Sequence, residues 1–135
     1  IILINKYWEG QVPSAKDLDD YDKEVLNKLF LFPNKIGFHI EKFQFKKALE
    51  ELINLARLGN KYLADKEPWK LKGIDDSQTE TIMYISMQII ASLSILSKPF
   101  LPFSSKKLKT LINLEEENWD AANSELIKGL IYFKK

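Results

Sequence analysis

The longest clearly periodic stretch, Phe43–Ala64, constrains the fold most. Its apolar residues recur at three- and four-residue steps, which places them on one face of an α-helix. They are Phe45, Ala48, Leu49, Leu52, Ile53, Ala56 and Leu63. On the opposite face, Lys47 and Glu51 are four residues apart and can pair. Gly59 lies within this helix, where Gly costs about 1 kcal/mol relative to Ala, and we interpret it as a position that a neighbouring element approaches closely.

Acidic residues upstream predict the start of another helix. Such residues favour the positive end of the helix dipole. Here they are Asp17, Asp19, Asp20 and Asp22. We predict a helix over about Leu18–Phe32, interrupted or kinked at Pro33, with Ile36–Lys42 able to resume the pattern. The acidic residues lack the glycine spacing and closing glutamate of a calcium-binding loop, so we do not interpret them as metal ligands.

The most apolar run, Thr81–Leu96, predicts a buried central helix. It is too short, and too rich in Ser, Thr and Gln, for a membrane span. We expect the helix to run from about 78 to 97, with Asp76 or Ser77 as its cap and Glu80 bonding back to Ser77.

Proline-marked links separate the remaining segments. Ser104 or Ser105 is expected to cap a short helix that ends at Leu114. Its inward residues are expected to be Leu108, Leu111 and Ile112. The first segment, Ile1–Trp8, is typical of the last turns of a helix. The last segment, Leu126–Phe133, is typical of either a short strand or a helix end. Together the patterns predict an all-α, antiparallel bundle of four to five helices, with residues 1–135 forming one domain.

Composition excludes several kinds of chemistry. The chain has no Cys, which removes disulfides, thiolate metal sites and thiol catalysis. Its single histidine, His39, excludes a multi-histidine metal site and has no nucleophile or carboxylate partner set up near it in sequence. The sequence also lacks a phosphate-binding glycine loop. We therefore expect this chain alone to be non-catalytic, with no cofactor or metal of its own.

Charge is unevenly distributed along the chain. The net charge is only +1, from 20 basic and 19 acidic residues, which does not suit a domain that binds nucleic acid by charge alone. Residues 41–72, however, hold eight basic and five acidic residues, a balance of +3. The positive excess therefore lies on the periodic helix and the segment that follows it.

That segment ends in an aromatic corner. Pro68 disfavours the helical region for Glu67, so the helix is expected to end before it, with Trp69 where helix becomes loop. A tryptophan there is either a core plug or a stacking platform. Lysines beside an available ring are typical of proteins that capture single-stranded nucleic acid, since lysines attract phosphates and the ring stacks on a base.

These residues also resemble a known family. The matching positions are Phe45, Ala48-Leu49, Asn60-Lys61-Tyr62 and Pro68-Trp69-Lys70-Leu71, followed by Pro99-Phe100-Leu101-Pro102 and Ser104. They are similar to the A-L, N-x-Y, P-W-x-L and P-F-[ML]-P-x-[ST] motifs of the anticodon-binding domain of methionyl-tRNA synthetases. Tyr7, Gly10 and Pro13 fit the element that precedes the second helix of that domain. The tail after Trp119 fits the segment that folds back toward the catalytic body.

The resemblance implies a function and roles for particular residues. It implies that the bundle reads the CAU anticodon of methionine tRNA, with Trp69 stacking on an anticodon base and Pro68 fixing its loop. Asn60 and Tyr62 match N-x-Y and are expected mainly to brace the helix end. Phosphate candidates, on proximity, are Lys61, Lys66 and Lys70.

The chain also departs from the family pattern. An Asn and an Arg four residues apart on the first helix read the anticodon in the family, but that helix enters here only at its end. We therefore expect a truncated first helix, with Asn5 not taking that role, and an absent catalytic domain. The resemblance implies that the longer, cytoplasmic enzyme charges methionine tRNA using methionine and ATP with Mg, and that any zinc site lies outside this chain.

The alternative hypothesis is a non-catalytic helical module for protein–protein interaction, without a membrane role in either case. The two hypotheses make different demands on one side chain. Anticodon recognition needs Trp69 exposed in a concave basic corner. A buried Trp69, with an exposed apolar groove elsewhere, would favour the interaction module.

Overall fold

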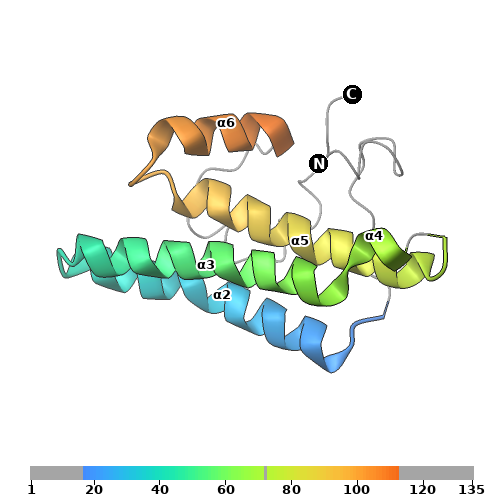
Figure 1. Cartoon of the computed structure of the whole chain (residues 1–135). Helices are drawn as coiled ribbons and strands as arrows, with labels where there is room; N and C mark the ends of the chain where they lie inside the picture. The colour runs from blue at the N-terminus through green and yellow to red at the C-terminus, as the bar shows by residue number, and fades with distance from the viewer. Residues whose placement is uncertain (1–16, 72, 113–135) are drawn as a thin grey trace.

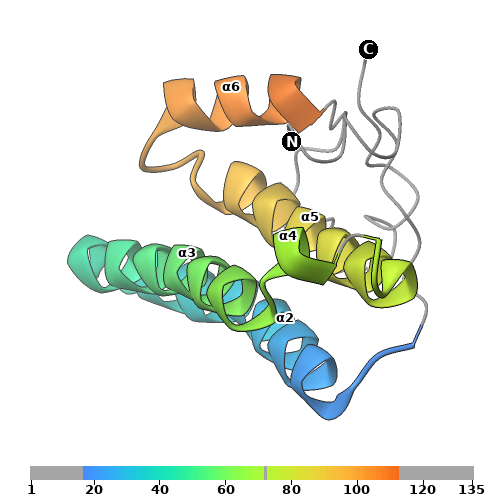
Figure 2. The ribbon, with the colours of Figure 1, turned by 45° about the vertical axis from the view of Figure 1, so that its right-hand side comes forward.

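The structure is a computed structural model that describes residues 17–71 and 73–112 (Figure 1). These residues form five helices and no strand, which confirms the all-α class. The helices are α2 (Asp20–Glu41), α3 (Phe45–Lys66), the single turn α4 (Pro68–Leu71), α5 (Asp76–Leu96) and α6 (Pro102–Ile112). Helices α2 and α3 form an antiparallel hairpin, α5 packs against both, and α6 lies on the far side of α5 (Figures 1 and 2).

Helix α5 is the centre of the bundle. Fifteen of its 21 residues are buried, because α2, α3, α4 and α6 pack against it. Several of its hydroxyl groups bond to nearby backbone carbonyls, as Ser86 does to Ile82 (2.7 Å) and Ser94 to Ala91 (2.7 Å). In the described residues α5 alone is long and apolar enough to cross a membrane, but 83% of that apolar window is buried inside the domain. Packing therefore explains its hydrophobicity, as predicted.

Gly59 lies where α3 meets α5, which confirms the predicted close approach. A Cβ atom added at Gly59 would lie 3.0 Å from Cγ2 of Ile89, a buried residue of α5. A larger side chain would push the two helices apart.

Of the two predicted effects of Pro33, an interruption or a kink, the interruption is wrong. Helix α2 continues through Pro33 to Glu41, and the proline is itself buried. Proline inside a helix removes a hydrogen bond and costs about 3 kcal/mol. Apolar residues on both sides of it, Val25 and Leu29 before and Ile36 after, are buried in one core, and this burial offsets the cost.

Two predicted helix starts are also displaced. The cap of α5 is Asp75, whose carboxylate accepts from the N–H of Gln78 (3.0 Å), rather than Asp76 or Ser77. Helix α6 begins at Pro102, ahead of the predicted caps, since proline suits a first helical turn, where no donor is needed. Ser105 instead is buried and donates its hydroxyl to the Ser94 carbonyl of α5.

The inward face predicted for the short helix is partly wrong. Leu108 is half-buried, but Leu111 is 58% exposed. Several predictions lie outside the described residues: those on Ile1–Trp8, Gly10, Pro13, Leu114, Trp119 and Leu126–Phe133.

Candidate nucleic-acid interface

The end of α3 turns the chain sharply at Glu67. This residue adopts the left-handed conformation (φ 46°, ψ 59°), and its N–H bonds to the carbonyl of Leu63 (2.9 Å). Helix α3 thus ends before Pro68, as the sequence predicted. Pro68 then begins α4, where a missing N–H costs nothing.

The single turn α4 has one face in the core and one in solvent. Pro68 is buried and Leu71, three residues on, packs against the core. Trp69 is 55% exposed, and Lys70 beside it is also exposed. The interpretation of Trp69 as a core plug is therefore wrong. The turn rests against α5, which fixes the base from which the indole projects (Figure 2).

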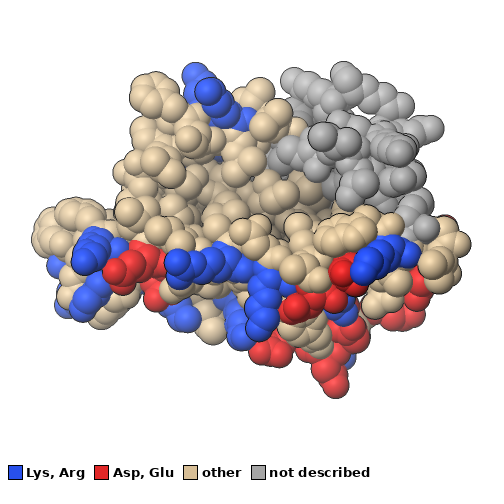
Figure 3. All heavy atoms as spheres, viewed as in Figure 1, with Lys and Arg blue, Asp and Glu red and all other residues tan. Residues whose placement is uncertain are grey.

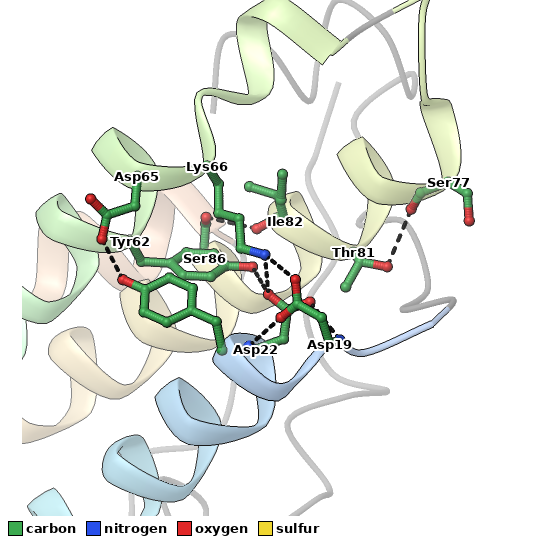
Figure 4. A network of polar contacts seen from close by, with 10 residues as sticks. Asp19, Asp22, Tyr62, Asp65, Lys66, Ser77, Thr81, Ile82 and Ser86 are labelled. Atoms are coloured by element: carbon green, nitrogen blue, oxygen red, sulfur yellow. Dashed lines mark hydrogen bonds and ion pairs between the residues drawn. The ribbon is translucent and has the colours of Figure 1, made fainter.

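A polar network lies at the end of α3, just before this corner in the chain. It is formed by Asp19, Asp22, Tyr62 and Lys66 (Figure 4). The hydroxyl of the fully buried Tyr62 donates to Asp22 (2.7 Å). The Lys66 ammonium bonds to Asp19 and lies 3.3 Å from Asp22. Asp19 and Asp22 also cap α2, each accepting from the other's backbone N–H. The network thus joins the first turn of α2 to the last turns of α3.

A second tyrosine extends this connection outward. The Tyr21 hydroxyl donates to Asp65 (2.6 Å), and its ring stacks on Tyr62 with centroids 5.8 Å apart. Lys66 lies over the Tyr21 ring, 5.4 Å from its centroid. The end of α3 is therefore held by aromatic and ionic contacts just before Trp69.

Protonation in the network follows from these contacts. Burial, then the hydrogen bond to Asp65, raises the pKa of Tyr21 to about 12. Burial and the bond to Asp22 also raise the pKa of Tyr62. For Lys66, burial acts to lower the pKa, but the bonds and charges of the two aspartates outweigh it and raise the pKa overall. The Lys66 hydrogen bond lowers the pKa of Asp19.

The seven predicted site residues divide into two groups. Four are exposed on the surface: Asn60, Lys61, Trp69 and Lys70. Tyr62 and Pro68 are buried, and the Lys66 side chain is only 10% exposed and turned toward Asp19. Lys66, a phosphate candidate on sequence proximity, is paired in the structure with the carboxylates of Asp19 and Asp22, which its position in the sequence did not reveal.

Sequence reasoning also missed the network itself. Tyr62 and Lys66 are four residues apart on α3, and Asp19 and Asp22 are three apart at the start of α2. The spacing within each pair indicates that its two side chains lie on the same face of a helix. It does not indicate that the two pairs contact each other across the two helices. The acidic residues were interpreted only through the helix dipole.

Two observations bear on metal binding and on the single histidine. The described residues include no group of His, Asp or Glu side chains arranged to hold a metal ion. The Nδ1 atom of His39 lies 2.9 Å from the Gln44 side-chain oxygen, in the connection between α2 and α3. His39 therefore serves that connection.

Comparison with known proteins identifies the family. Residues 12–132 match the anticodon-binding domain of methionyl-tRNA ligase. The chain belongs to this family. It is 48% identical over 120 residues to the methionine–tRNA ligase of Christiangramia forsetii, covering 89% of this chain and 17% of that protein. With the enzyme of Phocaeicola vulgatus it shares 41% identity over 143 residues, covering 100% of this chain and 21% of that protein.

The fold agrees with this assignment. The apo methionyl-tRNA synthetase of Mycobacterium tuberculosis superimposes with a TM-score of 0.84 at 21% identity, covering 91% of this chain and 26% of that chain. The chain thus spans about a fifth of the length of its curated relatives. An apolar hollow of 460 Å³ does lie on α6, lined by Phe103, Lys106, Lys107, Thr110 and Leu111. The exposed Trp69 nevertheless favours the anticodon-binding domain over the interaction module.

Proposed function

We propose that this domain, residues 1–135, recognises the CAU anticodon of methionine tRNA, with the Trp69 ring stacking on an unstacked anticodon base. One observation carries the proposal: Trp69 is 55% exposed on a turn whose other face is buried. Stacking of a base on an aromatic side chain contributes about 1–3 kcal/mol. A ring held by a buried proline can supply this without first ordering a loop.

Three exposed residues that lie near Trp69 in the sequence are added to the proposed interface. Lys61 and Lys70 are candidates for phosphate contacts, and Asn60 is exposed beside Lys61. Lys70 pairs with Glu67 (2.9 Å), but both side chains are well exposed. Such pairs contribute only about 0–1 kcal/mol, so a phosphate can replace the carboxylate.

The parent protein is proposed to be a cytoplasmic methionine–tRNA ligase. Its activation of methionine with ATP and Mg would take place on a catalytic domain outside these residues, as would any zinc site. The role of this chain is then binding: it selects the tRNA whose acceptor end the catalytic domain charges.

The test is Trp69→Ala in the longer ligase. We expect aminoacylation of methionine tRNA to fall by about five- to 150-fold, as the loss of one stacked base predicts, while ATP-dependent methionine activation stays unchanged. Trp69→Phe should retain part of the activity, because a smaller ring still stacks. If both activities fall together, or neither changes, Trp69 does not stack on the anticodon.

A further inference from the structure

The connection between α2 and α3 ends in exposed aromatic side chains. Phe43 is 81% exposed, Phe45 56% and Phe38 54%. We call residues 38–47 the hairpin end. It lies at the opposite end of α3 from α4 (Figure 1). Helix α3 has 22 residues, so this end is about 33 Å from the Trp69 corner.

The backbone of Phe43 is costly for the fold. Phe43 adopts the left-handed conformation (φ 57°), which favours glycine or asparagine. The turn is firmly held: the N–H of Phe43 bonds to the Ile40 carbonyl (3.0 Å), and that of Gln44 to the His39 carbonyl (2.8 Å). The His39–Gln44 side-chain bond closes it. An exposed phenyl ring at such a position adds nothing to the core, so the requirements of the fold do not explain it.

The rings at the hairpin end form an ordered surface. Phe43 and Phe45 meet edge to face, with centroids 6.3 Å apart and planes at 77°. The Lys42 ammonium lies 5.9 Å from the centroid of Phe38. The hairpin end therefore exposes an aromatic pair and, separately, a lysine over a third ring.

The charge around these rings is positive. Residues 35–47 hold four lysines and one acidic residue, Glu41. The lysines are Lys35, Lys42, Lys46 and Lys47, all exposed. In the part of the chain that the structure describes, none of them forms an ion pair. Figure 3 shows basic side chains at this end of α3, with acidic side chains directly beside them.

This combination fits RNA better than protein. Lysine is depleted in protein–protein interfaces. Exposed rings among lysines match the way that proteins hold unpaired nucleotides, by stacking on bases and attracting the backbone. We propose that the hairpin end is a second RNA-binding surface, in which Phe43 and Phe45 contact an unpaired base and the lysines contact phosphates. The proposal rests on the proposed function only in taking RNA as the ligand, since this surface does not read the anticodon.

The experiment is Phe43→Gly in the longer ligase, because glycine removes the ring and suits the left-handed backbone. Binding is measured by fluorescence anisotropy with a methionine tRNA transcript and with the same transcript carrying a changed anticodon. We expect a loss of affinity of about five- to tenfold, equal for both transcripts. The thermal unfolding temperature should stay the same or rise.

Charge is tested with a matched pair of double variants. Lys46→Gln/Lys47→Gln should reduce the magnitude of the slope of log affinity against log salt by about 1–2. Lys23→Gln/Lys28→Gln removes the same charge from exposed positions on α2 and should leave that slope unchanged. Leu31→Ala, at an exposed apolar position of α2, is the matched control for the lost ring.

The outcomes separate the two proposals. If Trp69→Ala abolishes discrimination between the transcripts and Phe43→Gly changes no affinity, the hairpin-end proposal is overturned and the anticodon proposal stands. If Trp69→Ala leaves the discrimination between the transcripts unchanged and Phe43→Gly weakens binding to both, the anticodon proposal alone is overturned. If Phe43→Gly leaves RNA affinity unchanged but lowers the unfolding temperature, another part of the ligase covers this surface, and the hairpin-end proposal is wrong.

Discussion

Tyr62 supports the end of α3, just before Trp69, without itself reaching the surface. Its ring is fully buried, and its hydroxyl donates a hydrogen bond to the buried carboxylate of Asp22. A buried carboxylate depends on such donors, since it has little water to replace them. The end of α3 that precedes Trp69 is thus supported by a buried phenol, in addition to the packing of Pro68 and Leu71.

Tyr62→Phe tests this support. The change removes one hydrogen bond to a charged group, and we expect the free energy of unfolding to fall by about 1.5–3 kcal/mol. Urea denaturation of the chain, followed by circular dichroism, measures it. Tyr21→Phe is the matched control, because its bond to Asp65 is exposed and should contribute less. Equal losses in the two variants would show that burial of the Tyr62 hydroxyl has no special effect.

Alkaline pH tests the same network through Tyr21. Its pKa rises from 10.0 to about 12 on folding, so folding favours the protonated phenol. The resulting stability is fully present below pH 10 and is lost as pH rises from 10 to about 12. The free energy of unfolding should therefore fall over this window, and less steeply in Tyr21→Phe. An identical slope in both proteins would contradict the raised pKa. Tyr62 and Lys66, whose pKa values are also raised, account for the slope that remains.

At the scale of elements, the packing of α3 on α5 sets how the bundle closes. Gly59 allows the two helices to meet because it has no Cβ, and Ile89 occupies that space. Gly37 in α2 is a helical glycine with nothing within 4 Å of an added Cβ. Both glycines lower helix stability relative to alanine by a similar amount. Only at Gly59 does the missing side chain allow close packing against another helix.

This contrast predicts opposite effects of two substitutions. Gly37→Ala should raise the free energy of unfolding by about 0.5–1 kcal/mol, because alanine is the better helix former. Gly59→Val should lower it by about 1–3 kcal/mol, because the added methyl groups overpack against α5. Thermal and urea unfolding of both variants provide the comparison. A stabilised Gly59→Val protein would show that α3 can move away from α5 at no cost.

The same elements show what the sequence could reveal. The periodicity along α3 and the apolar run of α5 were sufficient to predict the all-α class. The Glu67–Pro68 pair was sufficient to predict where α3 ends. The continuity of α2 through Pro33 was not predictable, because it depends on burial against helices distant in sequence. The link between Asp22 and Tyr62, 40 positions apart, was equally beyond local spacing. Exposure of Trp69 followed only from the placement of α4.

For the whole molecule, the distribution of charge matters more than its total. A net charge of +1 gives little general attraction to RNA. Exposed lysines lie at both ends of α3, whereas acidic side chains gather where α2 begins (Figure 3). Binding by the chain should therefore depend on a small set of local phosphate contacts.

The salt dependence of tRNA binding by residues 1–135 measures this set. We expect a dissociation constant in the micromolar range or weaker, and a slope of log affinity against log salt of about −3 to −5, as roughly five lysine–phosphate contacts predict. Filter binding across a salt series is sufficient. Tight binding that does not change with salt would contradict a phosphate-based interface.

The left-handed Glu67 and the buried Pro68 also have a consequence for binding kinetics. The turn that carries Trp69 is already formed in the unbound domain. Binding of tRNA would therefore need no slow rearrangement of this turn. Matched and mismatched anticodons should then associate at similar rates, and selection should come from how long each complex lasts. A tRNA with the wrong anticodon would be rejected by fast release rather than by slow capture.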